Sequence, residues 1–486
     1  MVAFFIIFHY NKNGDYMKLK EIPSKILYLY FFIPIAIGCF INYSSNEDIW
    51  YILKYGEIIL NKGFIHTDIL SMHSNLHLVI QQGFTNVIFY FIYSNFHTYG
   101  IFLFLELFVI LYLYFFYKIS YLLTNNKLYS VITCIVSTIF LEFFLYPRAQ
   151  LFTYLFILIT IYIFESFYKN NQTKLIYFLP LVSLLQINLH GALWISLFIF
   201  ILPFLIQLFI ERNKNIIKLI VIIILMFLVG FLNPYTYELV FFPFLSYSSS
   251  LNSIISELFP ITIFTNSGKI FYFLLATIIF FYIYNKNKKL EIRHLLLLYG
   301  TTFMTLLSIR NFAFFILGSI YPIMSYTKKS YIKVRSGGSV YLNLVYVFLI
   351  LVCLFFSIEM NSIRLVSSVK KSGNYLLKHY SDSDITLYSE FDFGSYLEYI
   401  GYHPYIDTRA EVFLKKANHK EDIFLEFSDV LNGTIDFDKF IDKYQFTHFI
   451  TYKNSYIERY LRKSSSFKKV FLDKNIIIYE SILYQQ

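Results

Sequence analysis

The chain has few charged residues and few cysteines. Lysine, arginine, aspartate and glutamate make up 15% of its 486 residues, whereas about 25% is usual for soluble globular proteins. Hydrophobic residues reach 57%, and the mean hydropathy is +0.56. Cys39, Cys134 and Cys353 all lie inside apolar stretches, so we expect them to be small core residues without a disulfide or metal role. The low content of charged residues and the high hydropathy exclude a soluble globular protein and indicate repeated membrane spans.

Several sequence motifs are also missing. The sequence contains no GxGxxG motif and no Walker motif, so it does not indicate a nucleotide-binding domain. No internal repeat of the kind found in transporters is evident. Residues 1–8 are apolar but too short to span a membrane, and no signal-peptide cleavage site follows them. Met17 precedes Lys18 and Lys20 in a more ordinary start, and we expect residues 1–16 to carry no function.

The net charge of +10 reflects membrane orientation rather than nucleic-acid binding, because the basic residues cluster in short gaps between apolar stretches. These gaps must all lie on the cytoplasmic side. They do so only if the apolar run around Arg310 is a hairpin with Arg310 at its outer turn, which gives eleven spans instead of ten. The predicted spans are 26–43, 98–117, 128–146, 151–168, 174–190, 192–210, 217–233, 269–284, 293–308, 311–326 and 340–358.

An odd number of spans places the amino end in the cytoplasm and the carboxyl end outside. We therefore expect a cytoplasmic segment 1–25, a transmembrane domain 26–358 with a first outer loop at 44–97, and an extracytoplasmic domain at 360–486. Within the outer loop, residues 78–95 predict a helix lying on the membrane surface. The last domain alternates predicted strands and helices, which indicates a small α/β structure. Its strands are expected at 384–388, 403–407, 446–452 and 475–480, with helices at 436–444 and 455–462.

The outer face carries the polar motifs. Glu47 and Asp48 directly follow the first span, where an acidic pair is either a solvated helix terminus or part of a catalytic site. A carboxylate there can act as general base toward an acceptor hydroxyl, and Asp48 is the better candidate. Trp50 could stack on a sugar ring or anchor the chain at the interface. Polar side chains are concentrated in the same loop, among them His66, Asp68, His73, His77, Gln81 and Gln82.

A metal site in this loop is not favoured. His66, Asp68, His73 and His77 are residue types that bind divalent cations. However, Ser74 and Asn75 disfavour the helix that would bring His73 and His77 onto one face. Local turn bonding is the commoner role for a residue such as Asp68.

Two arginines on the outer face are candidates for phosphate binding. Arg148 and Arg310 both lie in apolar surroundings, where a guanidinium can hold a lipid phosphate bidentately or simply extend to the lipid headgroups. His190 ends a span, and Asn233 precedes a proline at a helix stop. Glu238 and Glu257 are further outer carboxylates that could supply a second acid.

Several short motifs, taken in order, resemble a group of bacterial multi-pass membrane proteins related to the C-type (GT-C) glycosyltransferases. The matches are Glu47-Asp48-Ile49-Trp50, Gly56-Glu57-Ile58, Gly63, Thr67-Asp68, Ser71, Arg148-Ala149-Gln150-Leu151-Phe152, Asn188-Leu189-His190-Gly191, Asn233-Pro234-Tyr235, Arg310-Asn311-Phe312, Asp392-Phe393-Gly394-Ser395-Tyr396-Leu397 and Ile406-Asp407-Thr408-Arg409-Ala410.

The resemblance departs from the family pattern at two places. Tyr51-Ile52 replaces a usual Trp-His pair, and Gln81-Gln82 stands where the family often has His-Glu.

The resemblance implies an α-helical polytopic protein of the bacterial cytoplasmic membrane that transfers a hexosyl or pentosyl group. The donor would be a polyprenyl-phosphate-linked sugar, and the acceptor an extracytoplasmic glycan, lipid or protein, with membrane lipids as further partners. Asp48 maps to the family's catalytic base, and no cofactor is implied. We predict a catalytic set of Asp48, Glu47 and Asp68, with substrate contacts from Trp50, His66, Gln82, Arg148, Gln150, His190, Asn233 and Arg310.

Two other functions remain open from the sequence. A polysaccharide polymerase or ligase would use a lipid-linked oligosaccharide, so the length of the transferred glycan distinguishes it. A non-enzymatic lipid or polymer transporter would need ionisable residues at mid-membrane depth. Only Glu106, Glu142 and Glu165 are carboxylates within predicted spans, and we expect them to lie near span ends or to be isolated.

Overall fold

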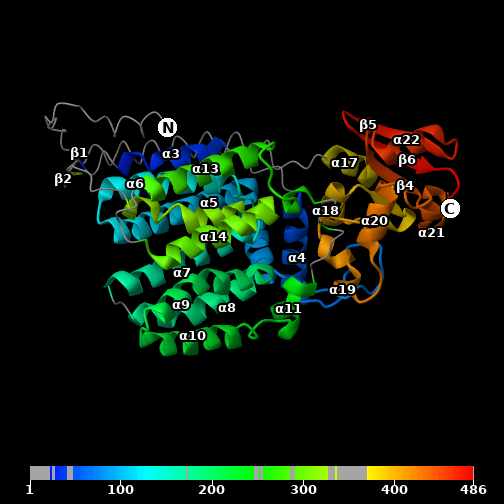
Figure 1. Ribbon diagram of the computed structural model, residues 1–486. Helices are drawn as coiled ribbons and strands as arrows, with labels where there is room; N and C mark the ends of the chain where they lie inside the picture. Colours follow the sequence, from blue (N-terminus) through cyan, green and yellow to red (C-terminus); the bar gives the residue numbers. More distant parts are fainter. Residues whose placement is uncertain are drawn as a thin grey trace, which may run out of the picture.

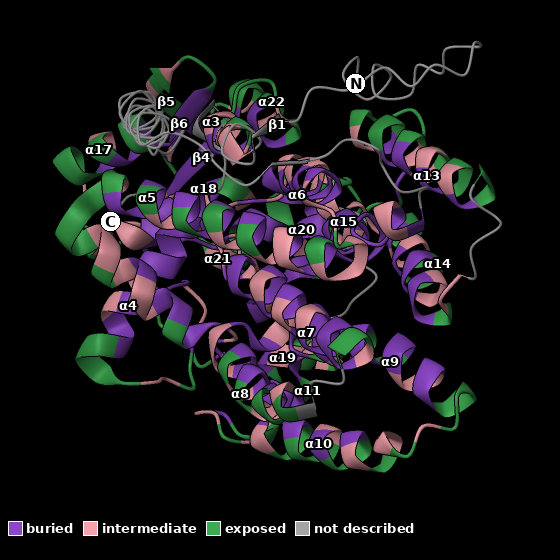
Figure 2. Ribbon diagram, turned by 90° about the vertical axis from the view of Figure 1, so that its left-hand side faces the viewer, coloured by how far each residue is buried: buried purple, intermediate pink, exposed green. Residues whose placement is uncertain are grey.

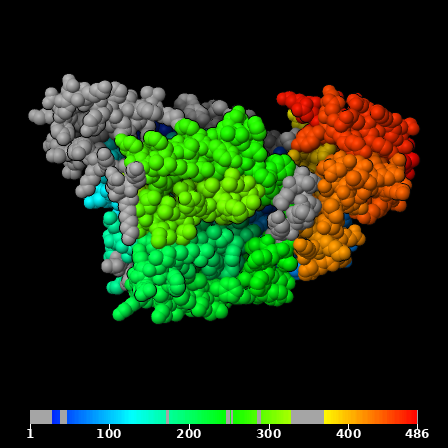
Figure 3. All heavy atoms as spheres, in the orientation of Figure 1, coloured from blue at the N-terminus to red at the C-terminus, as the bar shows by residue number. Residues whose placement is uncertain are grey.

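The computed structural model describes residues 22–23, 28–40, 47–170, 173–245, 251, 255–284, 290–326, 334–335 and 369–484. A helical body and a carboxyl-terminal α/β domain lie side by side, with α4, α11 and α18 at the junction between them (Figure 1). The space-filling view shows the carboxyl-terminal residues as a lobe beside the helical body (Figure 3). Most of the predicted segment 1–25 and the whole predicted span 340–358 lie outside the described residues.

Apolar helices of different lengths form the body in the regions where the sequence predicted spans. They are α3 (Phe32–Phe40), α5 (Gly83–Thr124), α6 (Lys127–Glu142), α7 (Gln150–Asn170), α8 (Leu179–Leu189), α9 (Ile195–Ile210), α10 (Asn215–Val229), α13 (Asn266–Tyr284), α14 (Ile292–Leu307) and α15 (Phe312–Ser319). Short 3-10 turns extend or join them: η2 (Thr173–Phe178), η3 (Gly191–Leu193), η5 (Ile309–Asn311) and η6 (Ile323–Tyr326). Arg310 lies in η5 between two helices that pack together, so the predicted break of the apolar run at Arg310 is confirmed.

Four helices are long and apolar enough to cross a membrane: 83–124, 150–170, 191–210 and 266–284. Four shorter apolar helical segments accompany them in the described chain. Figure 2 shows exposed positions along α10 and α13, and large apolar side chains occupy many of these positions. Leu228 is 55% exposed and Phe280 is 62% exposed, which suits contact with lipid rather than water. The molecule is a membrane protein, and the total of eleven spans stays a prediction.

The first outer loop contains a helix that the sequence did not predict. Helix α4 (Asp48–Lys62) packs against the start of α5. At Gly56 a Cβ atom would lie 2.3 Å from the carbonyl oxygen of Asn86, so only glycine allows the two backbones to approach this closely. Helix α5 changes direction at His97, where φ is 51°. Its first part therefore corresponds to the predicted helix at 78–95, although it begins at Gly83.

A four-stranded mixed sheet forms the centre of the carboxyl-terminal domain. The strand order is β3-β4-β6-β5, with β3 parallel to β4 and the other neighbouring pairs antiparallel. The strands are β3 (Leu387–Ser389), β4 (His448–Tyr452), β5 (Phe467–Asp473) and β6 (Ile476–Ser481). The predicted strand at 403–407 is wrong, because Pro404 forms only an isolated bridge with Leu387, and β5 was not predicted.

Short helices surround this sheet. They are α17 (Lys370–His379), α18 (Phe391–Tyr399), α19 (Lys415–Asn418), α20 (Ile423–Leu431), α21 (Phe437–Tyr444) and α22 (Tyr456–Lys463), with turns η7 (Asp382–Asp384) and η8 (Ala410–Phe413). The last two helices confirm the predicted segments 436–444 and 455–462. In the helical body, α11 (Tyr237–Leu245) and η4 (Ser256–Leu258) follow α10, and β1 (Ile22–Pro23) pairs with β2 (Val334–Arg335).

A buried arginine of the carboxyl-terminal domain forms an ion pair with the first outer loop. Arg409 lies 2.6 Å from Asp68, and also 2.6 Å from Glu398 and from Asp407, and the four side chains are at most 1% exposed. Arg409 also donates a hydrogen bond to the hydroxyl of Tyr55 on α4. Removing one member of such a buried group leaves uncompensated charge, so the network makes the docked position specific.

A second buried ion cluster joins α7 to α14 within the helical body. Glu165 on α7 contacts Arg293 at 3.0 Å and His294 at 2.8 Å, both on α14. Tyr321 also donates a hydrogen bond to this carboxylate and is its third partner. Glu165 lies near the end of α7, as expected, but it is not isolated, because partners from two later segments neutralise and hold it.

Candidate active site

Four charged side chains meet at the junction of the two domains. Asp48, the first residue of α4, lies 2.7 Å from the Nε atom of Arg148. The Nη1 atom of Arg148 lies 3.3 Å from Glu257 in η4. Glu257 in turn lies 3.8 Å from the Nε atom of Arg310 in η5. The structure thus brings together the predicted base and both predicted phosphate-binding arginines, which are far apart in the sequence.

Local structure explains the position of each group. Asp48 lies in the first turn of α4, where the backbone dipole favours a carboxylate. Arg148 lies in the tight turn between α6 and α7, in which its backbone N–H donates to the Tyr146 carbonyl at 2.7 Å. Arg310 occupies the break between α14 and α15.

The carboxyl-terminal domain completes the site from the other side. The hydroxyl of Thr408 donates a hydrogen bond to Asp48. Glu411, in η8, accepts a hydrogen bond of 2.9 Å from the Nε2 atom of Gln81. Asp48 therefore interacts both with Arg148 of the helical body and with Thr408 and Glu411 of the carboxyl-terminal domain.

Burial and neighbouring charges set the protonation of this cluster. Burial raises the pKa of Asp48 above its usual value, and Arg148 opposes that effect. Burial disfavours the charged guanidinium of Arg148, but Asp48 and Glu257 outweigh it and raise its pKa. Burial also raises the pKa of Glu257, but Arg148 and Arg310 outweigh it and lower that pKa. Arg148 consequently stays cationic, and Asp48 is a stronger base than an exposed aspartate.

This arrangement suits a reaction that combines proton removal with departure of an anion. Two guanidinium groups can hold a phosphate, and the carboxylate beside them can take a proton from a hydroxyl. The side chain of Asp48 is 14% exposed and that of Arg310 is 43% exposed, so substrate atoms have access to both.

Trp50 and Asp68 have packing partners that account for them without substrate. Trp50 is 6% exposed, and its ring centroid lies 5.0 Å from those of Tyr396 and Tyr399 on α18. Asp68 accepts hydrogen bonds from Ser71 and is paired with the buried Arg409. The third predicted catalytic residue, Glu47, is the residue preceding α4 and adjoins Asp48 in sequence.

The remaining predicted substrate-binding residues have partners outside the four charged groups, although His190 also feels the charge of Arg310. His66 packs against Tyr235, Gln82 donates to the hydroxyl of Tyr51, and Gln150 begins α7. His190 is buried and bonded to Thr153 at 2.7 Å. The side-chain amide of Asn233 donates to the carbonyls of Gly230 and Thr236, which closes the turn after α10.

No group of three or more potential metal ligands occurs within the residues that the structure describes. His73 bonds to the carbonyl of Tyr405 at 2.8 Å. The ring of His77 stacks on that of His419, and its Nε2 atom lies 3.4 Å from Glu238.

Three residues of the carboxyl-terminal domain at this junction had no predicted role. Thr408 and Arg409 were part of a recognised motif but were given no role, and Glu411 follows directly after it. Their signal was the run Ile406-Asp407-Thr408-Arg409-Ala410, in which a charged pair interrupts apolar residues. Glu257 was considered only as a second acid, whereas it bridges the two arginines.

No family model matches the chain, and no curated protein matches it significantly. Among solved structures, it is similar to the Archaeoglobus fulgidus oligosaccharyltransferase tethered to an acceptor peptide, with 11% identity and a TM-score of 0.54 over 87% of this chain and 69% of that one. The same archaeal enzyme, AglB, in complex with an inhibitory peptide and a dolichol-phosphate gives 10% identity and a TM-score of 0.53 over 88% and 70%. The chain therefore has the fold of GT-C glycosyltransferases, as its motifs predicted.

Proposed function

We propose that this chain is a membrane glycosyltransferase that moves a sugar from a polyprenyl-phosphate donor to an acceptor on the extracytoplasmic face of a bacterial membrane. The contact that carries the proposal is the ion pair between Asp48 and Arg148, in one cluster with Arg310. The archaeal structure that contains dolichol-phosphate supports a lipid phosphate as the donor's carrier.

Asp48 acts as general base in the proposed reaction. The acceptor hydroxyl gives its proton to the Asp48 carboxylate while its oxygen forms a bond to the anomeric carbon of the sugar. The bond between that carbon and the phosphate oxygen breaks, and the phosphate leaves with the electron pair. Arg148 and Arg310 neutralise the departing phosphate, which is the main electrostatic demand of the step.

The ion pairs around Arg148 define what the donor must displace. Arg148 contacts two carboxylates, Asp48 and Glu257. A bound phosphate competes for the same guanidinium and so releases Asp48 to accept a proton. Donor binding thereby converts Asp48 from an ion-pair partner into a base, and the reaction needs no divalent cation.

Sugar transfer by membrane vesicles that contain Asp48→Asn tests this proposal. Asparagine keeps the size of the side chain but cannot accept the proton, so we expect transfer to fall at least a hundredfold, within the usual range for general-base removal. Glu57→Gln is the matched control, because it removes a carboxylate of the same helix that pairs with Lys54, and it should keep most of the activity. Equal transfer by wild type and Asp48→Asn would refute the assignment.

A polymerase or ligase that uses lipid-linked oligosaccharides remains the alternative. The same cluster would serve it, because its leaving group is also a lipid phosphate. The length of the glycan added in one turnover distinguishes the two: a single sugar supports the proposal, and an oligosaccharide supports the alternative.

A further inference from the structure

Three consecutive residues between α18 and η8 contact two separate sites. Asp407 and Arg409 belong to the buried ion network that also contains Asp68 of the first outer loop. Thr408, between them, has a different partner, because its hydroxyl donates a hydrogen bond to the carboxylate of Asp48. The residues on either side of Thr408 are therefore fixed in the ion network, while Thr408 itself contacts the proposed base.

The backbone before Thr408 lies against helix α18. A Cβ atom at Gly394 would lie 2.1 Å from the carbonyl oxygen of Ile406, so only glycine permits this approach. The next residue of the helix, Ser395, is fully buried. Its hydroxyl bonds to that of Thr408 at 2.6 Å, and its oxygen accepts a hydrogen bond of 3.4 Å from the Thr408 amide. One serine therefore fixes both the backbone and the hydroxyl of Thr408.

Helix α18 also packs against the first turn of α4. Trp50 lies two residues after Asp48 in α4. Its ring centroid is 5.0 Å from that of Tyr396, the residue after Ser395. The serine that holds Thr408 thus adjoins the contact between the two helices. This packing does not depend on the charges of the site, and it accounts for the hydrogen bond between Thr408 and Asp48.

The direction of these hydrogen bonds follows from the number of protons. A hydroxyl has one proton to donate, and Thr408 donates its proton to the Asp48 carboxylate. Ser395 must therefore donate to Thr408. Because Ser395 is buried, this chain of bonds ends inside the protein and does not lead the proton of Asp48 to solvent. The chain instead favours the negative charge of Asp48 and orients its carboxylate.

Thr408 acts on Asp48 together with charged and titratable groups. Burial raises the pKa of Asp48, whereas Arg148 and then Thr408 lower it. In the proposed reaction a bound phosphate competes for Arg148, but it exerts no such attraction on the uncharged Thr408. Thr408 is therefore the partner that keeps its contact with Asp48 when the donor binds. The other titratable or charged groups that interact with Asp48 are Tyr51, Glu257, Arg310 and Glu411.

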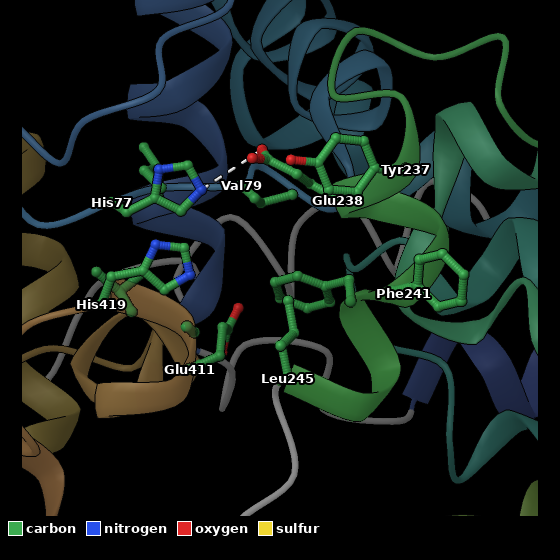
Figure 4. A pocket seen from close by; sticks show the side chains of 12 residues that line it. His77, Val79, Tyr237, Glu238, Phe241, Leu245, Glu411 and His419 are labelled. Carbon is green, nitrogen blue, oxygen red and sulfur yellow. Dashed lines mark ion pairs between the residues drawn. The ribbon is translucent and has the colours of Figure 1, made fainter.

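We propose that Thr408, held by Ser395, is a positioning residue that directs the Asp48 carboxylate toward the acceptor hydroxyl. This inference rests on the proposed glycosyl transfer and deepens it, because the carboxyl-terminal domain then supports the base directly. Besides the buried arginine network, stacked rings hold this domain against the outer loop: the ring centroids of His77 and His419 are 4.7 Å apart (Figure 4). Full activity consequently requires the domain in its docked position.

Thr408→Val tests the inference, because valine has the shape of threonine but lacks its hydroxyl. Membrane vesicles that contain the full-length protein supply the acceptor, and radiolabelled polyprenyl-phosphate hexoses and pentoses serve as donors. At pH values above the acid limb, kcat should fall roughly tenfold, as expected for the loss of one hydrogen bond to a charged group. The donor KM should change by less than about twofold, because Arg148 and Arg310 are untouched.

The pH profile separates positioning from a merely structural role. Loss of the hydrogen bond raises the pKa of Asp48, so the acid limb of kcat/KM should move to higher pH in Thr408→Val. Thr408→Ser keeps the hydroxyl and should restore both the rate and the limb. Thr451→Val is the matched control and should behave like wild type, because this buried threonine of β4 donates only to a backbone carbonyl, at 3.5 Å.

A second variant covers the case in which Thr408→Val does not fold. Ser395→Ala removes the hydroxyl that donates to Thr408, and it should move the acid limb in the same direction by a smaller amount. The amides of Met72 and His77 donate hydrogen bonds across the domain boundary, so their hydrogen exchange reports docking. Exchange at both amides should stay as in wild type for the two variants.

Each result has one consequence. An acid limb at the wild-type pH in both Thr408→Val and Ser395→Ala, with Asp48→Asn inactive, would overturn the positioning role and leave the proposed transfer intact. A fall in kcat accompanied by faster exchange at Met72 and His77 would also overturn it, because the domain would then have loosened. Absence of transfer by the wild type with every donor would refute the proposed function, and the inference with it.

Discussion

Arg409 offers the sharpest test of how the carboxyl-terminal domain is held over the site. Its guanidinium is 1% exposed and contacts three carboxylates, those of Asp68, Glu398 and Asp407, each at 2.6 Å. Replacing it with methionine keeps the apolar length of the side chain but leaves three buried carboxylates without their cation. Removal of one partner from a buried ion pair costs about 3–5 kcal/mol.

Much of this cost is relieved if the domain separates from the outer loop, because Asp68 belongs to the loop and the other two carboxylates to the domain. Two backbone hydrogen bonds cross this boundary and report on docking. The Met72 amide donates to the carbonyl of Pro404 at 3.1 Å, and the His77 amide donates to the carbonyl of Asn418 at 3.2 Å. A loss of about 3 kcal/mol corresponds to roughly a hundredfold faster hydrogen exchange at these amides.

Hydrogen–deuterium exchange of the purified protein in nanodiscs measures this directly. Arg459→Met is the matched control, because Arg459 lies on the exposed side of α22 in the same domain. Such a surface substitution changes stability by about 0.5 kcal/mol or less, hence exchange by roughly twofold. Similar exchange at Met72 and His77 in Arg409→Met and Arg459→Met would refute the role of Arg409 in docking.

Two further predictions concern the charge around Asp48 and the packing of glycines. Since transfer needs ionised Asp48, the acid limb of kcat/KM against pH should follow its pKa; Glu257 raises that pKa and Arg310 lowers it. Glu257→Gln should therefore move the limb to lower pH and Arg310→Gln to higher pH, and shifts in one direction for both would contradict the electrostatic account. A Cβ at Gly394 would lie 2.1 Å from a backbone oxygen, whereas one at Gly300 would meet nothing within 4 Å. In thermal unfolding, Gly394→Ala should cost about 1–3 kcal/mol and Gly300→Ala should gain about 0.5–1 kcal/mol; destabilisation by both would show that the close contact is not the cause.

The sequence predicted most of the helical body because apolar length is a local property. The hairpin around Arg310 followed from charge parity alone, and the structure confirms the break in the helix there. Helix α4 was not predicted because four charged residues interrupt its apolar residues and keep its mean hydropathy below that of a membrane span. These residues are Asp48, Lys54, Glu57 and Lys62. The strand predicted at 403–407 failed because Pro404 cannot continue a ladder of backbone hydrogen bonds.

The site itself was predictable only in part. Asp48, Arg148 and Arg310 were identified by residue type and by the face on which they lie, but their meeting depends on contacts across 100 residues or more of chain. The role of Trp50 was ambiguous for the same reason, because its neighbours Tyr396 and Tyr399 belong to the carboxyl-terminal domain. Long-range pairing is set by tertiary packing, which one sequence without packing information does not specify.

The release of polyprenyl phosphate by the purified protein tests the central claim most directly. Wild-type protein in nanodiscs, given a polyprenyl-phosphate sugar and an acceptor, should release one polyprenyl phosphate for each sugar transferred. Asp48→Asn should lower the rate at least a hundredfold without raising the donor KM, because Arg148 and Arg310 still hold the phosphate and asparagine competes less for Arg148. Release by Asp48→Asn at the wild-type rate, or no release by wild type, would contradict the account.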